Sequence, residues 1–337
     1  MRNLSKDPLR IVAIGGGTGL SVLLKGLKRY AGQLDHPRVD ITAVVTVTDD
    51  GGSSGRLRRE FDVLPPGDIR NCMVALSEDE GLLSRLFQYR FESGRGLKGH
   101  SFGNLFLTAL TRITGDFPAA VKESAEVLAI QGRIYPATTR NVVLEATLEG
   151  GRRVQGETRI SRSRRRIVSV RLQPRKCRPL PETLAAIAAA DLITLGPGSL
   201  FTSVVPNLLV SGISEAIRKS PAIKAYFVNL MWQPGETTAF AASDHLRVVH
   251  QHARGSLLDY AILNTKPIKS ALIARYASQQ AAPVENDTAR IAAMGVNVIC
   301  GDLLQQAVKV RHNPDAIAAV AVKLALDGRR RRKSPRS

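Results

Sequence analysis

The sequence is poor in cysteine and in long apolar runs, and these two shortages exclude several classes of protein. Cys72, Cys177 and Cys300 lie far apart with no CxxC pair, so we expect neither a disulfide framework nor a zinc site. The longest aliphatic stretch, 184–195, is interrupted by Asp191 and is shorter than the roughly 18 apolar residues of a membrane helix. Residues 1–10 are not followed by an apolar h-region, which predicts a cytoplasmic protein without a signal peptide or membrane contact.

The sequence also lacks the short signatures that identify an enzyme or a cofactor site on their own. GxSxG, HExxH and the P-loop pattern GxxxxGK[ST] are absent. A glycine-rich segment occurs at 15–19, but the dinucleotide fingerprint GxGxxG needs glycine at its sixth place, where Leu20 stands. These absences disfavour an NAD-dependent dehydrogenase and a P-loop ATPase.

Acidic residues are few relative to basic ones, and the basic excess is local. The chain has 48 Lys and Arg against 29 Asp and Glu, a net charge of +19. Segment 152–178 has 11 basic residues and one acidic residue (+10), and segment 328–337 has 6 and none (+6). Neither segment contains an aromatic residue that could stack on a nucleic-acid base. We expect a disordered basic tail at 328–337, and only weak polyanion contact through this tail and the segment 152–178.

Strand and helix patterns alternate regularly along the chain. Short apolar runs rich in β-branched residues are typical of buried parallel strands, and they lie at 11–14, 41–47, 192–195, 225–230, 260–263 and 296–299. Between them, apolar residues recur at helical spacing, as at 20–27, and Asn313-Pro314 begins an Ala-rich helix. The pattern predicts an α/β fold with a Rossmann-like, doubly wound, mostly parallel sheet.

Two departures from this alternation predict insertions. Residues 68–132 are mostly helical in pattern, which predicts a helical insertion. Alternating apolar and polar residues at 142–148, 154–160 and 167–172 predict a small antiparallel β insertion, 141–178, on the solvated surface. We therefore expect an N-terminal tail (1–9), one domain (10–327) that carries both insertions, and the basic tail (328–337).

Two glycine-rich segments directly follow predicted strands. Glycines let the backbone approach an anion closely, and the free N–H groups of a following helix attract it. The first segment comprises Gly15, Gly16, Gly17, Thr18 and Gly19; the second comprises Gly196, Pro197, Gly198 and Ser199, followed by Thr202. Because ligands of open α/β sheets bind at the carboxyl ends of the strands, we expect the two segments to flank one crevice. A tight strand–helix turn that binds nothing is the alternative for each.

A third segment combines carboxylates, hydroxyls and a cation after the predicted strand 41–47. It comprises Asp49, Asp50, Gly51, Gly52, Ser53, Ser54 and Arg56. Adjacent carboxylates can bind sugar hydroxyls or a hydrated Mg²⁺, and the serine-glycine backbone with an arginine can bind phosphate. We expect this segment and the two glycine-rich segments to form a single anion-binding cleft. Weaker candidates beside strand ends or helix starts are Asp68, Asn71, Asn104, Asn229, Gln233, Glu236 and Arg311.

Taken together, these motifs resemble the YvcK/CofD-like family. The resemblance runs in order from about Arg10 to Asp327, and it rests on GGGTG at 15–19, TDDGGSSGR at 48–56, PGDIRN at 66–71, GNL at 103–105, GPGS at 196–199 and QPGET at 233–237. The basic β insertion, Pro206–Leu209 and Arg311-His312 are more similar to the YvcK branch, the gluconeogenesis factors, than to the CofD branch.

The resemblance implies a protein that binds a UDP-sugar such as UDP-N-acetylglucosamine and regulates envelope synthesis, cell shape and growth on gluconeogenic carbon. The CofD branch implies instead a transferase that moves a phospholactyl group from a guanosine diphosphate donor to an acceptor hydroxyl, assisted by Mg²⁺ at Asp49 and Asp50, which would then be catalytic. By motif, segments 15–19 and 196–199 would hold the diphosphate, and Arg311 would contact an anion or the sugar. Trp232 stands where the family pattern has a small hydroxylic residue, and it could stack on a base or block an acceptor. We also expect a homo-oligomer.

Overall fold

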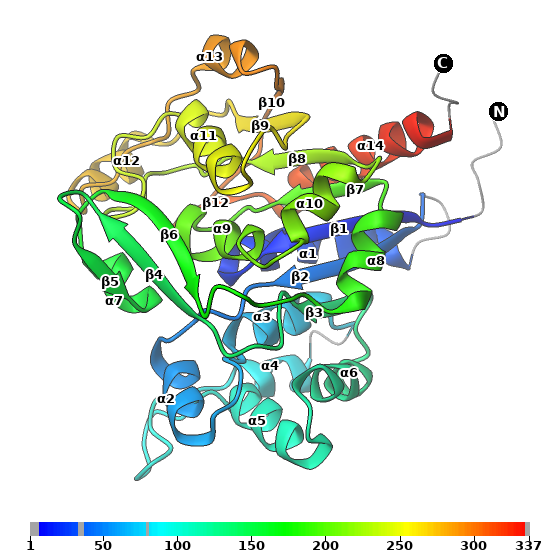
Figure 1. The fold of residues 1–337 in the computed structure, drawn as a ribbon, viewed down its shortest axis with the longest axis vertical. Coiled ribbons are helices and arrows are strands. Elements are labelled where there is room, and N and C mark those ends of the chain that lie inside the picture. Colours follow the sequence, from blue (N-terminus) through cyan, green and yellow to red (C-terminus); the bar gives the residue numbers. More distant parts are fainter. Residues whose placement is uncertain (1–6, 33–36, 79–80, 334–337) are drawn as a thin grey trace.

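A computed structural model describes residues 7–32, 37–78 and 81–333 (Figure 1). Its central feature is a seven-stranded sheet with the strand order β10-β9-β8-β7-β1-β2-β3, in which every neighbouring pair is parallel. The strands are β1 (Leu9–Gly15), β2 (Val39–Val45), β3 (Arg133–Pro136), β7 (Leu192–Leu195), β8 (Ile223–Phe227), β9 (Tyr260–Asn264) and β10 (Asn297–Gly301). This sheet confirms the predicted α/β, doubly wound fold.

One strand of the sheet, β3, is missing from the sequence prediction. It is only 4 residues long, begins at the exposed Arg133 and ends at Pro136. Proline removes a backbone donor and is tolerated in sheets mainly at edges, which is where β3 lies. Its sequence, Arg-Ile-Tyr-Pro, has no continuous apolar run, in contrast to Leu-Ile-Thr-Leu of β7, which has the same length and was predicted.

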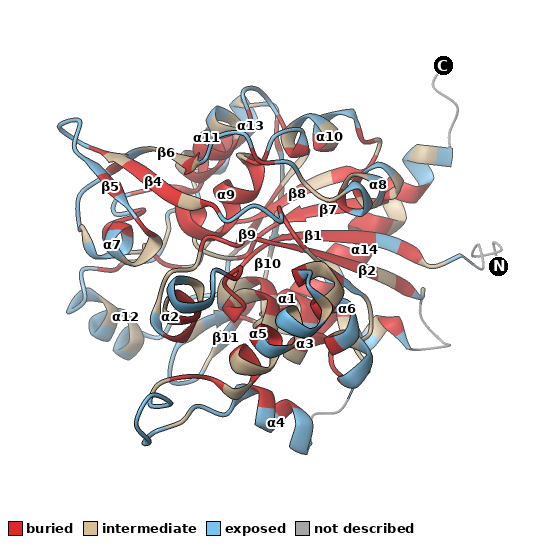
Figure 2. Ribbon diagram, turned by 60° about the horizontal axis from the view of Figure 1, so that its bottom comes forward, coloured by how far each residue is buried: buried red, intermediate tan, exposed pale blue. Residues whose placement is uncertain are grey.

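Helices cover both faces of the sheet (Figure 2). On one face lie α1 (Gly17–Ala31), α3 (Gly67–Leu76) and α14 (Pro314–Lys333). On the other lie α8 (Pro181–Ala189), α9 (Val205–Leu208) and α10 (Ile213–Lys219), with one π-helical turn, Leu200–Val204, before α9. The layers therefore enclose β1 and β7, the strands that precede the two glycine-rich segments.

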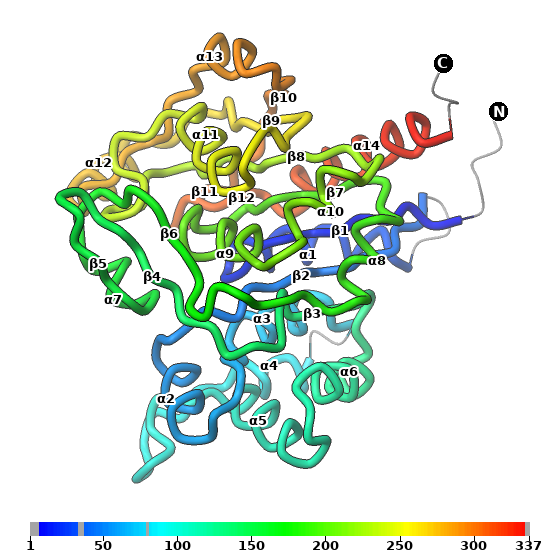
Figure 3. The backbone as a smooth tube through the Cα atoms, viewed as in Figure 1, coloured from blue at the N-terminus to red at the C-terminus, as the bar shows by residue number. Residues whose placement is uncertain are grey.

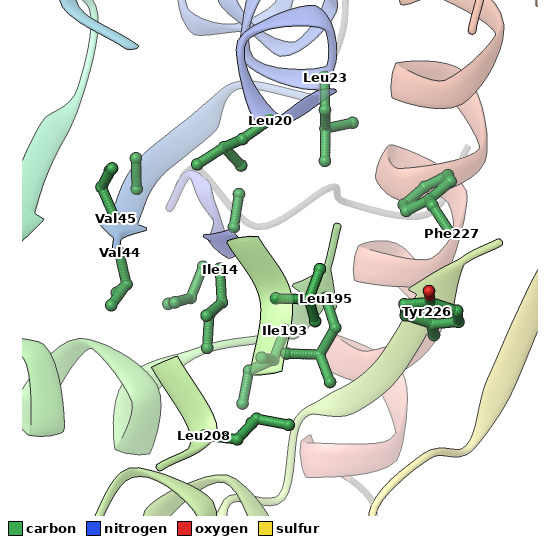
Figure 4. Packing of buried hydrophobic residues seen from close by; sticks show 14 of the residues in the cluster. Ile14, Leu20, Leu23, Val44, Val45, Ile193, Leu195, Leu208, Tyr226 and Phe227 are labelled. Atoms are coloured by element: carbon green, nitrogen blue, oxygen red, sulfur yellow. The ribbon is translucent and has the colours of Figure 1, made fainter. Parts of the chain in front are cut away.

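The core of the protein lies on both faces of these central strands. Leu20 and Leu23 of α1 pack over one face of the sheet near Ile14, and Leu208 of α9 packs over the other (Figure 4). These side chains are at most 3% exposed. Burying one such side chain contributes roughly 1.5–3 kcal/mol, so the core fixes the ends of β1 and β7 firmly.

Helix α2 (Gly52–Phe61) precedes the predicted helical insertion. The insertion itself consists of four helices. They are α3, α4 (Leu82–Gln88), α5 (Phe102–Thr114) and α6 (Phe117–Val127), and they form the lower part of the molecule in Figure 1. Phe87, Phe102 and Phe106 contact one another between α4 and α5. This group stabilises the insertion beside the start of α3.

The β insertion is a three-stranded antiparallel sheet, β5-β4-β6, but one predicted strand is wrong in part. Its strands are β4 (Val143–Leu148), β5 (Arg153–Gln155) and β6 (Ile167–Gln173). The predicted run 154–160 is a strand only to Gln155, because Gly156 has a φ of 93° and helix α7 (Glu157–Arg162) follows. The insertion is also more than a solvated surface feature, because α7 contacts the candidate site described below.

The remaining elements lie between β8 and α14. They are α11 (Ala242–His252), α12 (Ser270–Ala277), α13 (Thr288–Ala293) and the antiparallel pair β11 (Leu304–Gln306) and β12 (Val310–His312). The smooth trace in Figure 3 shows that α12 and α7 lie on the same side of the molecule, at the carboxyl edge of the sheet. Cys72 and Cys177 are buried and Cys300 is exposed, each as a free thiol, as the sequence predicts.

The predicted chain ends need correction where the structure describes them. Strand β1 already begins at Leu9, inside the predicted tail 1–9, while residues 1–6 lie outside the described residues. The predicted disordered tail 328–337 is helical as far as Lys333, and only 334–337 lie outside the described residues. Arg329 is buried and donates to the carboxylate of Asp191. The sequence alone could not indicate this partner, because Asp191 lies 138 residues away, just before β7.

In the described part of the chain, no single helix is long and apolar enough to cross a membrane. Two helical segments, Leu200–Leu208 and Ile213–Lys219, are together long and apolar enough, but the chain bends by 75° between them.

Candidate functional site

The two predicted glycine-rich segments meet where the strand order of the sheet reverses. β1 has β2 on one side and β7 on the other, so the chain winds outward in both directions from the β1–β7 pair. In open α/β sheets, ligands bind outside the carboxyl ends of the strands at this position. The segments 15–19 and 196–199 follow β1 and β7 directly.

The contact between the two segments requires glycine. A Cβ atom on Gly19 would lie 2.4 Å from the carbonyl oxygen of Pro197, a distance that real Cβ atoms do not show. A Cβ atom on Gly198 would lie 3.3 Å from the Gly16 carbonyl oxygen, which is a tight contact, and the φ of 155° at Gly198 is one that other residues rarely adopt. The glycines therefore allow two backbone segments to touch, which is a structural reason for their presence alongside any role in anion binding.

A cavity of about 400 Å³ opens at this contact. Its volume falls in the range that small-molecule sites usually have. Among the described residues that line it, none is Asp or Glu, and Arg311 supplies a cation. The lining brings together ten of the residues predicted from sequence: Gly16, Gly17, Thr18, Gly19, Pro197, Gly198, Ser199, Asn229, Gln233 and Arg311.

Hydrogen bonds hold the polar side chains of this cavity in place. Gln233 Nε2 donates to Ser199 Oγ at 2.6 Å, and Asn229 Nδ2 donates to Gln233 Oε1 at 3.2 Å. The Gln233 backbone N–H donates to Thr237 Oγ1 at 3.0 Å. The segment after β8 is thereby bonded to the segment after β7, so the wall of the cavity is built before any ligand arrives.

The segment after β2 does not line this cavity, although we expected all three segments to form one cleft. Its side chains contact protein instead. Ser53 pairs with His100 Nδ1 at 3.0 Å, and Ser54 Oγ accepts hydrogen bonds from Asn104 Nδ2 and from the Gly67 backbone. Together these residues tie α2 to the starts of α3 and α5.

The remaining residues predicted around this segment are also bonded within the protein. Arg56 donates to the Lys98 carbonyl at 2.7 Å, and Asn71 Oδ1 accepts a hydrogen bond from Arg70. Asp49 Oδ1 accepts from the Gly51 backbone at 2.8 Å. The structure therefore places a packed polar cluster beside the cavity, with its ligand-binding role still a prediction.

Asp68, at the start of α3, connects this polar cluster to the cavity. A Cβ atom on Gly16 would lie 2.7 Å from Asp68 Oδ2, and the carboxylate accepts a hydrogen bond from the Gly17 backbone. Withdrawal from water, together with the nearby Asp49 carboxylate, raises the pKa of Asp68 to about 7. The Asp68 carboxyl therefore has a near-neutral pKa and lies behind the Gly16-Gly17 backbone, which lines the cavity.

Two further carboxyl groups complete an acidic cluster behind the cavity. Glu236 is buried, hydrogen-bonds to Ser161 of α7 and to Thr202, and has its pKa raised by burial to about 7. Burial and the nearby carboxylates also raise the pKa of Glu157 well above its usual value, and its Oε2 is buried without a hydrogen-bond partner. Glu157 was not predicted as a site residue. It lies in the basic segment 152–178, and its neighbours in sequence give no sign that it faces other carboxyl groups.

The acidic cluster offers little to a metal ion. Across residues 7–32, 37–78 and 81–333, no three His, Cys, Asp or Glu side chains are grouped as metal ligands. Asp50 Oδ1, one of the atoms predicted to hold Mg²⁺, accepts two hydrogen bonds from Thr158. One oxygen of Asp50 is therefore bonded to α7, and Mg²⁺ binding at Asp49 and Asp50 stays a prediction.

Several cavity residues were not predicted from sequence as ligand contacts. Ser203, Leu230, Met231 and Tyr276 line the cavity without having been predicted, while His312, a weaker candidate beside Arg311 in the sequence, and Trp232 also line it. Tyr276 comes from α12 and His312 from β12, both far along the chain. Only their three-dimensional arrangement brings them to the glycine-rich segments.

Comparisons with known proteins agree with this architecture. The model of the family described as 2-phospho-L-lactate transferase CofD matches residues 11–304. The gluconeogenesis factor of Halalkalibacterium halodurans is 48% identical over 309 residues, covering 91% of this chain and 94% of that protein. The gluconeogenesis factor of Bacillus subtilis is 48% identical over 316 residues, covering 94% and 98%.

A solved structure gives the same result for the fold. The crystal structure of a UPF0052 family member from Bacillus halodurans superposes with a TM-score of 0.89 and 46% identity, covering 94% of this chain and all of that one. Both the sequence match and the structural match extend over nearly the whole chain. The chain therefore belongs to the YvcK/CofD-like family, also called UPF0052.

Proposed function

We propose that this protein is a cytoplasmic regulator that binds a nucleotide sugar of the UDP-N-acetylglucosamine type and acts in gluconeogenic growth, cell shape and envelope synthesis. The regulatory role in gluconeogenesis is supported by the relatives named gluconeogenesis factor, which align with nearly all of this chain. The ligand class is supported by the chemistry of the cavity.

The observation that carries the ligand class is the meeting of two glycine-rich segments and Arg311 around one cavity. The segment after β1 opens α1, a 15-residue helix whose free backbone N–H groups favour an anion. Arg311 can pair with two phosphate oxygens through its planar guanidinium. Because no carboxylate lines the described walls, an entering diphosphate meets no fixed negative charge there.

A transferase of the CofD type is the second candidate, and Asp68 favours it. A general base must lie within hydrogen-bond reach of the proton it removes and have a pKa near the working pH. Asp68 lies beside the Gly16-Gly17 backbone and has a pKa of about 7. In such a reaction Asp68 would take the proton of an acceptor hydroxyl, a role that sequence reasoning assigned to Asp49 or Asp50.

Isothermal titration calorimetry with UDP-N-acetylglucosamine, GDP and NAD, each with and without Mg²⁺, separates these functions. We expect selective binding of UDP-N-acetylglucosamine without turnover. Arg311→Ala should weaken this binding at least tenfold, whereas the control Arg290→Ala, on the exposed side of α13, should leave it unchanged. Preference for GDP with Mg²⁺-dependent consumption of a guanosine diphosphate donor would instead establish the transferase.

A further inference from the structure

A second cavity, of about 490 Å³, adjoins the first along helix α1. Thr18, Val22 and Arg311 line both cavities, so the two are lobes of one crevice. The second cavity continues along α1 past Lys25, which follows Thr18 at helical spacing and so lies on the same face of the helix. Its opposite wall comes from α3 and α4.

The two lobes differ in chemistry. The first cavity has apolar and aromatic walls at the end away from α3, formed by Leu230, Met231, Trp232 and Tyr276; we call this end the aromatic lobe. The second cavity has hydroxyl, amide and ammonium groups beside apolar side chains, and we call it the polar lobe; the polar groups belong to Ser21, Lys25, Lys28, Asn71, Ser84 and Gln88. Thr18 and Arg311 lie between the two lobes.

Hydrogen bonds within the protein fix both aromatic side chains of the aromatic lobe. Trp232 Nε1 donates to the Phe240 carbonyl at 3.0 Å, and the Trp232 backbone N–H donates to the Ala282 carbonyl at 2.8 Å. Tyr276 is fixed as well, because its hydroxyl oxygen accepts a hydrogen bond from the Val310 backbone at 3.1 Å. Because both the indole N–H and the backbone N–H of Trp232 are hydrogen-bonded, a base can stack on the indole ring with little loss of side-chain entropy.

Building on the proposed function, we propose that the two lobes bind the two ends of one nucleotide sugar. The base stacks on Trp232 in the aromatic lobe. The diphosphate lies between the lobes, at the start of α1 and against Arg311. The sugar occupies the polar lobe, where Gln88 and Lys25 hydrogen-bond its hydroxyl and acetamido groups; a sugar needs such partners because its polar groups lose water on binding.

Calorimetry with two probes, UDP and UDP-N-acetylglucosamine, tests this assignment. Trp232→Ala should weaken both probes by the same factor, about tenfold. Gln88→Ala and Lys25→Ala should each weaken UDP-N-acetylglucosamine about fivefold and change the affinity for UDP by less than twofold. Lys122→Ala, on the exposed side of α6 and outside both lobes, is the matched control and should change neither affinity.

Fluorescence tests the stacking without a substitution, because Trp232 is the chain's one tryptophan. UDP and UDP-N-acetylglucosamine should quench its emission equally, and the quench should persist in Gln88→Ala. This measurement also covers the case in which Trp232→Ala does not fold.

The outcomes distinguish the lobe assignment from the function on which it rests. If the wild-type protein binds neither probe, the proposed function is wrong, and the assignment falls with it. If both probes bind but Gln88→Ala and Lys25→Ala weaken them equally, or if binding leaves the Trp232 emission unchanged, only the lobe assignment is overturned.

Discussion

Asp50 caps the first turn of α7 by accepting two hydrogen bonds from Thr158, from its backbone N–H at 2.9 Å and from its hydroxyl at 2.7 Å. The carboxylate thus satisfies one of the free N–H groups at the start of a helix that lies 108 residues further along the chain. Gly156 makes room for it, since a Cβ there would lie 2.2 Å from Asp50 Oδ2. This contact joins the β insertion to the segment after β2.

Removing this cap should loosen the insertion. Asp50→Ala leaves two donors of Thr158 without their partner, which should lower the free energy of unfolding by about 1–3 kcal/mol. Hydrogen exchange should also speed up within 157–162. Thr158→Val removes only the hydroxyl bond, so chemical denaturation should show a smaller loss. Equal exchange rates in the wild type and in Asp50→Ala would show that other contacts hold α7.

The contact between the two glycine-rich segments makes Gly19→Ala a sharp test. The new methyl group would meet the Pro197 carbonyl at 2.4 Å, so one segment must move away. We expect at least a tenfold loss of UDP-N-acetylglucosamine affinity, because a shift of the helix start misplaces the N–H groups that bind phosphate. Gly32→Ala is the control, since nothing lies within 4 Å of its Cβ position. Unchanged affinity in Gly19→Ala would contradict the account of this contact.

The raised pKa values of Asp68 and Glu236 make stability depend on pH. Burial raises them to about 7 from ordinary values of 3.8 and 4.5, so the folded state holds protons that the unfolded state has released. The free energy of unfolding should therefore fall as the pH rises from about 4 to about 7, and then level off. Urea denaturation of the wild type from pH 5 to pH 8 measures this slope.

Neutral variants should reduce this dependence on pH. Asp68→Asn and Glu236→Gln remove the titrating group while keeping its shape, so each should flatten the slope between pH 5 and pH 7. Glu123→Gln, at an exposed site on α6, serves as the control and should leave the slope as it is. A slope unaltered in both buried-site variants would mean that other groups cause it.

The end of α14 should contribute to stability, in contrast to the disordered tail expected from sequence. Arg329 donates to Asp191, which is wholly buried, and its loss would leave that charge with Arg332 and the Arg10 backbone N–H as partners. Breaking a buried pair is strongly destabilising, so Arg329→Ala should lower the free energy of unfolding by about 3 kcal/mol. Arg330→Ala, whose partner Asp327 lies on the surface, should cost less than about 1 kcal/mol. Similar melting temperatures for the two variants would show that the Arg329 pair contributes little.

Local patterns predicted the layers of the fold well. Six of the seven strands show as apolar runs because parallel strands are buried on both faces, and the leucines of α1 show as a helical stripe. Patterns of this kind do not depend on distant residues. Local patterns did not predict the helical start of the basic tail, because the partner of Arg329 is Asp191, which precedes β7 and is far away in sequence.

Local sequence patterns also predicted part of the candidate site. Gly15–Gly19 and Gly196–Ser199 follow strands directly, and parallel topology brings strand ends together. Segment 49–56 has the same kind of composition, yet its side chains bond to α5 and α7 rather than facing the cavity. Tyr276 lines the cavity because α12 packs beside it, and the sequence around Tyr276 does not predict this packing.

A crystal structure with UDP-N-acetylglucosamine tests the central claim most directly, that two glycine-rich segments form one diphosphate site. We predict diphosphate density at the backbone N–H groups of Thr18 and Gly19, between Ser199 and the Arg311 guanidinium. Nucleotide density confined to the segment Asp49–Ser54, or a nucleotide that contacts neither glycine-rich segment, would contradict the account.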